Sequence, residues 1–214
     1  MQPKHCIINS IYALLAFSTA ACKQPAEQPT NATPGEAYSV SQPEDDAEEG
    51  VNGQVVFAND DLDLGQTAGF ESAAMIGLRF QNIRIAQGSQ IKGAFLQFTA
   101  DDRGAKDEPT DLAIRAELVG DANSFSNELK NISSRELTHA TVNWSPDTWY
   151  KGDGRGPRQR SPDLSAVIQE VVDQDDWAEG NALVIVITGK GERDAISFDG
   201  GGNENGPTLF IETR

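Results

Sequence analysis

Residues 90–100 read QIKGAFLQFTA, and this stretch carries the clearest strand pattern in the chain. Successive side chains of an extended strand point to opposite faces, so Phe95 lies on one face while Leu96 and Phe98 lie on the other. Both faces carry large apolar side chains, which is typical of a strand that is covered on both sides. We expect residues 90–100 to form a strand in the middle of a sandwich rather than at its edge.

Shorter runs with strand character lie on both sides of this stretch, and clusters of glycine and asparagine separate them. The run ALVIVIT at 182–188 is continuous and β-branched, which predicts a buried strand. The other expected strands are 54–57, 74–80, 112–119, 195–198 and 207–213. Many short strands in one chain indicate an all-β protein, and we predict a jelly-roll-like β-sandwich.

Residues 161–173 have the spacing of an amphipathic helix instead of a strand. Ser161 is a favourable N-cap, Pro162 suits the first helical position, and Asp163 suits the positive end of the helix dipole. The aliphatic residues that follow at helical spacing form one apolar stripe: Leu164, Val167, Ile168, Val171 and Val172. We predict one short helix at about 161–173 that packs on the sheets.

Residues 1–21 have the layout of a bacterial export signal. A basic start at Lys4 precedes an apolar run from Ile7 to Phe17, and small residues follow. The apolar run is shorter than the roughly 20 residues that a transmembrane helix needs. We predict a signal peptide at 1–21 and no transmembrane helix.

Residues 18–22, STAAC, resemble the lipobox of bacterial lipoproteins, in which a cysteine after small residues receives lipid. The pattern departs from that family at Thr19, where leucine is preferred. Cys6 lies within the signal, so Cys22 would be the only cysteine of the mature chain, and an unpaired cysteine in an exported protein needs a reason. We predict lipidation of Cys22 and an outer-membrane or cell-surface location; the alternative is a secreted or periplasmic protein that is cleaved nearby.

Residues 22–50 are rich in proline and acids and nearly free of large apolar side chains. Such a composition does not bury enough surface to offset the entropy of ordering, so we expect a disordered tether. Residues 51–214 then form one β-sandwich domain. The formal charge is −16 and becomes −17 when residues 1–21 leave with one lysine and no acid, which disfavours nucleic acid as a partner.

Four segments, in order, resemble the DNRLRE-type domains, which are related to carbohydrate-binding module family 96. They lie within residues 52–214 and read LRFQNIRIAQGSQIKGAFLQFTAD, NISSRELTHATVNWSPDTW, RSPDLSAVIQEVVDQDDWAEGNALVIVITG and, at the C-terminus, LFIET. Such domains recur in secreted bacterial proteins. The resemblance implies a β-sandwich with a binding or display role and no catalysis, and some related modules bind alginate-like acidic polysaccharides.

Catalytic motifs are absent from the sequence. GxSxG, HExxH and the phosphate-binding P-loop do not occur, and His139 is the only histidine outside the predicted signal. We interpret His139 as a surface or hydrogen-bonded residue. Carboxylates are abundant, so a small glycan hydrolase with an acid pair stays open as an alternative, although no spacing singles out one pair.

Clustered acids suggest a structural calcium ion. Asp60, Asp61 and Asp63 lie within four positions, and Asp199 lies in the glycine-rich segment before the last strand. Calcium prefers several hard oxygen ligands on bendable loops. The EF-hand pattern does not fit, so we predict a calcium ion that joins two loops, with solvated turn acids as the alternative.

Residues 149–160 read WYKGDGRGPRQR and gather cations in an otherwise acidic chain. Arginines pair with carboxylates and aromatic rings stack on sugars, so we predict a ligand-binding site for acidic polysaccharide. Its residues are Trp149, Tyr150, Lys151, Arg155 and Arg158, and the alternative for Trp149 is a core position beside Trp144. The alternative is a loop that binds the acidic surface of its own chain. The sequence thus predicts a non-catalytic surface lipoprotein that binds carbohydrate; the rival prediction is a structural or adhesive protein that contacts another protein or a matrix.

Overall fold

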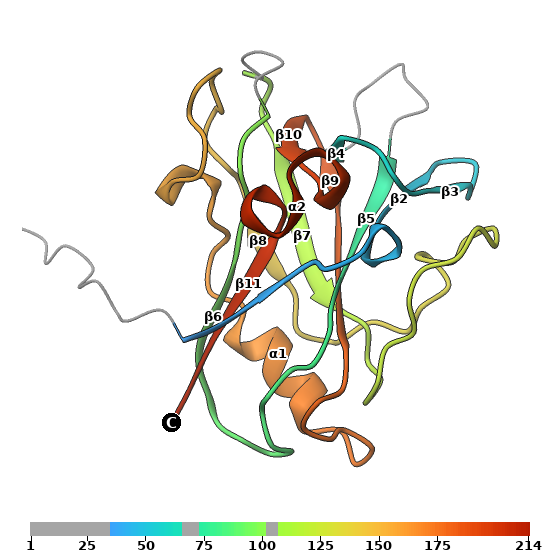
Figure 1. Ribbon diagram of the computed structural model, residues 1–214, viewed down its shortest axis with the longest axis vertical. Coiled ribbons are helices and arrows are strands. Elements are labelled where there is room, and N and C mark those ends of the chain that lie inside the picture. The colour runs from blue at the N-terminus through green and yellow to red at the C-terminus, as the bar shows by residue number, and fades with distance from the viewer. Residues whose placement is uncertain (1–34, 66–72, 102–106) are drawn as a thin grey trace, which may run out of the picture. The chain divides into compact units, whose positions relative to one another are not determined.

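Two antiparallel sheets and a short strand pair build the fold of the computed structural model (Figure 1). The structure describes residues 35–65, 73–101 and 107–214, which belong to one compact unit. The larger sheet has six strands in the order β3-β2-β5-β9-β7-β8. Its strands are β2 (Asp46–Gly50), β3 (Val55–Val56), β5 (Ala73–Phe80), β7 (Asp111–Ala116), β8 (Val142–Trp144) and β9 (Leu183–Lys190).

The smaller sheet has three strands in the order β1-β11-β6. They are β1 (Glu36–Ser39), β11 (Thr208–Thr213) and β6 (Ile91–Gln97). A separate pair joins β4 (Asp61–Leu64) to β10 (Arg193–Ile196). Buried side chains of both main sheets belong to one hydrophobic core, so the prediction of an all-β fold is confirmed.

The helices are short. α1 (Ser165–Val172) lies beside β6 and β7 at the lower end of the sheets in Figure 1. Its predicted apolar stripe is confirmed, because all five aliphatic residues from Leu164 to Val172 are buried in the core. α2 (Phe198–Asn205) is kinked at Gly202, and the 3-10 turns η1 (Pro43–Asp45) and η2 (Pro157–Gln159) complete the set.

α1 begins four residues later than predicted, because residues 159–164 pair with the free edge of β6. The backbone amides of Ser161 and Leu164 donate to Leu96 and Ala94 at 2.9 and 2.7 Å. The Ser161 hydroxyl accepts from the Leu96 amide at 2.9 Å instead of capping the helix, and Asp163 Oδ1 accepts from Ala94 and Ser165. The predicted cap residues therefore complete a sheet edge.

β6 is the last strand of its sheet and not a central one, which corrects the prediction from its pattern. Its inner face buries Ala94 and Leu96 in the core. On its outer face Phe95 stacks on Phe210 of β11, with ring centroids 4.9 Å apart, and the guanidinium of Arg160 lies 4.1 Å from the centre of the Phe95 ring. Local stacking, rather than a second sheet, covers the outer face.

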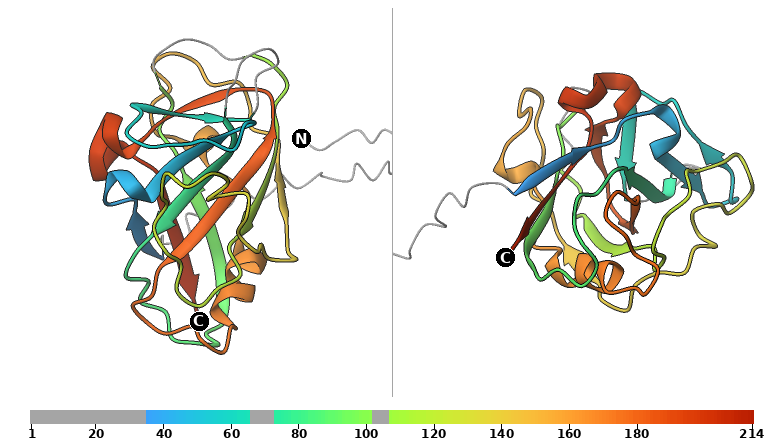
Figure 2. Two further views of the ribbon diagram at one scale, coloured as in Figure 1. Left: turned by 90° about the vertical axis from the view of Figure 1, so that its right-hand side faces the viewer. Right: turned by 60° about the horizontal axis from the view of Figure 1, so that its bottom comes forward.

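β9 is buried on both faces, as its continuous apolar run predicts. Ile185 and Ile187 belong to the main core, whereas Val184 and Val186 belong to a second cluster on the opposite face. The buried members of that cluster are Ala47, Val55, Ala122, Phe125, Ile132, Val184 and Val186. The segment 117–137 covers this face, and the left view of Figure 2 shows it in yellow-green in front of the sheet.

The prediction of a disordered tether at 22–50 is wrong for residues 36–50, because they form β1, η1 and β2 within the sheets. Their acids find partners that the composition does not reveal. Asp45 forms an ion pair with Arg79 at 2.8 Å, and Glu49 accepts from the amides of Ile132 and Ser133 at 2.8 Å each. The predicted domain boundary at residue 51 is thus too late.

The predicted signal peptide and Cys22 lie outside the described residues, as does the rest of the tether up to residue 34. Within the described ranges, no helix is both long and apolar enough to cross a membrane.

Candidate ligand-binding loop

The basic loop 149–160 joins β8 to α1 and starts in the core. Trp149 is 2% exposed and lies among Trp144 and Phe98, with ring centroids 6.2 and 6.3 Å away. Its indole Nε1 donates to the carbonyl of Arg158 at 3.1 Å, which ties the two ends of the loop together. The prediction that Trp149 contacts a ligand is therefore wrong, because packing takes up its ring.

Tyr150 is the next residue and points the other way, with 51% of its surface exposed. Asp153 closes a tight turn behind it. Its Oδ2 accepts from the Tyr150 amide at 2.8 Å, and its own amide donates to the Tyr150 carbonyl at 3.0 Å. Gly152 and Gly154 have φ of +85° and +58°, values that side chains with a Cβ rarely adopt.

Arg158 lies against the same turn. Its Nη2 forms an ion pair with Asp153 Oδ1 at 2.5 Å, and its guanidinium lies 5.8 Å from the centre of the Tyr150 ring. Half of the Arg158 side chain is exposed. The structure thus brings Tyr150 and Arg158 together as an exposed aromatic and cationic pair, and Asp153 organises that pair.

Arg155 lies on the side of the loop that faces α2. Its Nη1 donates to Thr99 Oγ1 at 3.3 Å and to the carbonyl of Gly206 at 3.1 Å, and both acceptors are uncharged. Burial of part of the guanidinium lowers the pKa of Arg155 below its ordinary value. The Arg155 side chain is exposed, and a cation whose hydrogen-bond partners are neutral gains from an anion that approaches from solvent.

Lys151 is exposed at the turn between Tyr150 and Asp153. Arg160 is held at the other end of the loop, where its Nε donates to Gln97 Oε1 at 3.3 Å beside Phe95. Four of the five predicted ligand residues are therefore exposed: Tyr150, Lys151, Arg155 and Arg158. Such a group can offer guanidinium and ammonium donors to carboxylates beside one aromatic face.

The predicted calcium residues lie near two further acids that the sequence did not single out. Asp61 and Asp63 are on β4, Asp199 is in the first turn of α2, and the carbonyl of Asp60 accepts from the Ser197 amide at 3.2 Å. No group of three histidine, cysteine or acidic side chains in the described part of the chain is placed to hold a metal ion. Calcium at these residues stays a prediction.

Asp46 and Glu48 of β2 are the two additional acids. Asp46 Oδ2 accepts from the Phe198 amide at 2.7 Å, and Glu48 accepts from the Asp63 amide at 2.7 Å and from Asn59 Nδ2 at 2.8 Å. The pKa of each carboxyl is raised to about 7, mainly because burial removes water from it and to a smaller extent because neighbouring acids are negatively charged. The neighbours are Asp199, Asp45 and Glu48 for Asp46, and Asp63 and Asp61 for Glu48.

Sequence reasoning missed the organising role of Asp153 and the acids of β2. The spacing Tyr-x-x-Asp beside two glycines is a usable signal for Asp153, because aspartate side chains often accept from nearby backbone amides in turns. No local signal marks Asp46 and Glu48, which lie in a run of acids that is typical of solvated segments.

No protein-family model matches this chain, and no curated protein matches its sequence. The likeness to DNRLRE-type domains accordingly rests on the four segments quoted from the sequence.

Proposed function

We propose that this protein is a non-catalytic binding module for acidic polysaccharide, and that Tyr150, Lys151, Arg155 and Arg158 form its binding site. One observation carries the proposal. The half-exposed ring of Tyr150 lies beside the Arg158 guanidinium on a cationic loop of a protein whose formal charge is −16. Uronic acid chains combine flat sugar faces with carboxylates, and this pair offers a partner to each.

The loop is held in shape before any ligand arrives. Trp149 anchors it in the core, Asp153 closes its turn, and Arg155 is tied to Gly206. Binding then needs little ordering of the loop, so more of the interaction energy contributes to affinity. The ion pair with Asp153 occupies only one edge of Arg158, whose other N–H groups can reach a carboxylate.

The proposal also covers the cellular location and the architecture of the domain. We propose export and lipid anchoring through Cys22, from the lipobox-like sequence, and a jelly-roll-like sandwich, from the many short strands. An anchored module with a net negative charge stays in solution above the membrane while one cationic loop selects anionic chains.

A polysaccharide binding assay tests the site. The whole chain is titrated by calorimetry with alginate, polygalacturonate and a neutral glucan, at low and at high salt. We expect binding to the two uronic acid polymers that weakens with salt, because the contacts of the loop are partly ionic.

Substitutions separate the loop from general charge effects. Two variants are expected to weaken polyuronate binding about tenfold each: Tyr150→Ala, which removes the stacking ring, and the double variant Lys151→Ala/Arg158→Gln, which removes charge-assisted contacts. Lys190→Ala removes an exposed cation outside the loop and serves as the matched control. A folded protein that binds neither polymer at low salt would overturn the proposal and favour a protein or matrix partner.

A further inference from the structure

The connection between β7 and β8 runs from residue 117 to 141 without a helix or strand. Connections of this length without secondary structure are uncommon inside a folded domain and are usually either functional or linker segments. This one lines an open hollow of about 510 Å³, and all eight of the lining residues are polar. Those that matter here are Glu117, Asn123, Asn131, Ser134, Arg135 and Glu136.

Arg135 fixes the wall of the hollow. Its guanidinium pairs with Glu117 at 2.5 Å, donates to the carbonyls of Asn123, Ser124 and Asn131, and donates to Asn131 Oδ1. It also lies 4.6 Å from the centre of the Phe125 ring. All five N–H donors of this arginine are therefore engaged within the protein.

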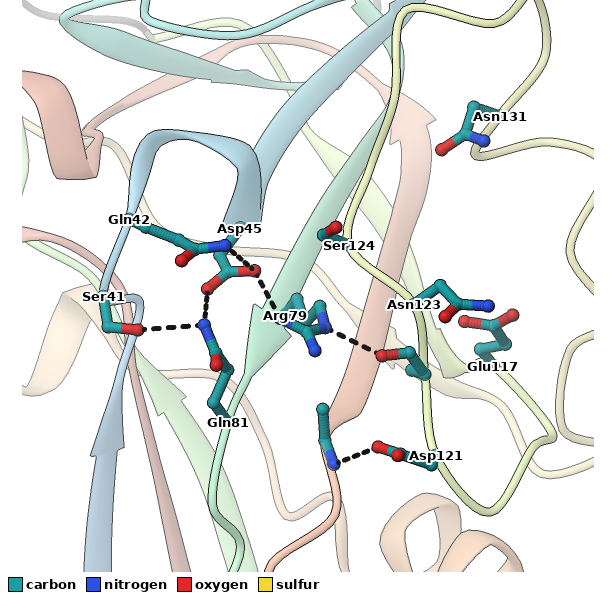
Figure 3. A network of polar contacts seen from close by, with 12 residues as sticks. Ser41, Gln42, Asp45, Arg79, Gln81, Glu117, Asp121, Asn123, Ser124 and Asn131 are labelled. Atoms are coloured by element: carbon teal, nitrogen blue, oxygen red, sulfur yellow. Dashed lines mark hydrogen bonds and ion pairs between the residues drawn. The ribbon is translucent and has the colours of Figure 1, made fainter.

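Two buried acids hold the rest of the segment. Glu49 accepts from the amides of Ile132 and Ser133, while Asp45 orients Arg79, whose Nε donates to the carbonyl of Ala122 at 2.8 Å. Figure 3 shows the contacts of Asp45 and Arg79 and, in the same view, the side chains of Asn123 and Glu117, which both line the hollow. The hollow is thus built on rigid supports, as a binding site requires.

The lining decides which ligands fit. An anion finds no free cation, because Arg135 is fully engaged and the two remaining charged groups, Glu117 and Glu136, are carboxylates. An apolar ligand finds no apolar side chain. The groups that face the hollow are carboxylate acceptors, serine hydroxyls and amides that both donate and accept, which match a ligand with many hydroxyl groups.

We propose that this hollow binds a small uncharged polyol, such as one or two pyranose units of a sugar chain. Its volume lies within the roughly 300–1,000 Å³ of ordinary small-molecule sites. Carboxylate oxygens of Glu117 and Glu136 accept hydroxyl protons, and the amide of Asn123 both donates to hydroxyls and accepts from them. Asn131 contributes its Nδ2 as a donor, because its Oδ1 already accepts from the Ser126 amide and Arg135. Figure 1 shows segment 117–137 and the basic loop on opposite sides of the sheets, and the right view of Figure 2 agrees. This second site does not depend on the proposed function of the loop.

An NMR titration of the whole ¹⁵N-labelled chain tests the site. The probes are methyl glycosides of glucose, mannose and galactose, with galacturonate as the charged comparison. We expect saturable amide shifts around Ser124, Ser126 and Asn131 for at least one neutral sugar at millimolar concentration, weaker binding of galacturonate, and no shifts around Tyr150. Tighter binding of galacturonate than of galactose, read from the shifts around Ser124, Ser126 and Asn131, would overturn the proposal. An absence of saturable shifts there with all three neutral glycosides would overturn it as well.

Paired substitutions in the same segment locate the binding. Asn123→Ala and Glu136→Gln are expected to weaken binding about fivefold each, which corresponds to the loss of about one hydrogen bond. Asn127→Ala removes an exposed amide that does not line the hollow and should leave affinity unchanged. If Asn127→Ala weakens binding as much as Asn123→Ala, the hollow is not the site. The loop variant Lys151→Ala/Arg158→Gln should bind the neutral sugar normally, so the failure of either proposal is recognised separately.

Discussion

Asp46 makes the stability of this protein depend on pH in a direction that is unusual for an acid. The carboxyl is 3% exposed, and burial, together with the charges of Asp199, Asp45 and Glu48, raises its pKa from 3.8 to about 7. A raised pKa in the folded state means that the protonated form folds more favourably. The folded state is therefore most favoured below the unfolded pKa, and stability is lost as the pH rises through about 7.

The magnitude follows from the two pKa values. Each unit of pKa difference corresponds to about 1.4 kcal/mol, so ionisation of Asp46 costs the folded state about 4 kcal/mol in total. About 3 kcal/mol of this cost arises between pH 5 and pH 8, because the unfolded carboxyl is already largely ionised at the lower value. Glu48, whose pKa is also raised to about 7, contributes in the same direction.

The perturbation is Asp46→Asn, which keeps an oxygen acceptor for the Phe198 amide and removes the charge. Urea unfolding followed by tryptophan fluorescence gives the free energy of unfolding of both proteins at about pH 5 and pH 8. We expect the variant to gain about 3 kcal/mol on wild type between the two pH values. Asp175→Asn replaces an exposed acid and is the control, with no such gain expected.

The same experiment can refute the reasoning. If the difference between Asp46→Asn and wild type is equal at both pH values, the folded carboxyl is not perturbed. If the variant loses stability relative to wild type as the pH rises, the pKa of Asp46 is lowered instead of raised, as it would be beside a cation.

Two further predictions concern the supports of the two sites. Trp149→Ala should lower the free energy of unfolding by about 3–5 kcal/mol because the ring is buried, while Tyr150→Ala should lower it by under about 1 kcal/mol. Urea unfolding compares the two variants. Equal losses would contradict the assignment of Trp149 to the core and Tyr150 to the surface. Glu49→Ala should lower the free energy of unfolding by about 2–4 kcal/mol, since it leaves the amides of Ile132 and Ser133 without their acceptor. It should also speed hydrogen exchange in residues 117–137. Unchanged exchange there would show that Glu49 does not hold the segment.

Local patterns predicted those parts of the fold that depend on short-range periodicity. The β-branched run at 182–188 forms β9, and the aliphatic stripe from Leu164 to Val172 faces the core. These predictions succeed because the pattern depends only on residues within one helix or strand and on an apolar surface for that element to pack against. The exact start of α1 was missed, since the distant strand β6 draws Ser161 and Asp163 into its edge.

In the candidate site, too, the sequence pattern and the tertiary packing decide different things about single residues. Trp149 and Tyr150 are neighbours with similar chemistry, and only the packing of Trp144 and Phe98 decides that the first is core and the second surface. The polar hollow could not be predicted, because its residues are held in place only by the contacts of Arg135 and of the buried acids in β2 and η1.

The sequence by itself determined an acidic, strand-rich chain with one amphipathic helix and one cationic loop, because composition and periodicity are properties of neighbouring residues. Only the tertiary structure decided that residues 36–50 are ordered, because their acids gain partners from distant parts of the chain: Arg79 for Asp45, the Phe198 amide for Asp46, and the amides of Ile132 and Ser133 for Glu49. Burial of a carboxylate is unfavourable until such partners are in place, and their presence is not encoded in any short stretch.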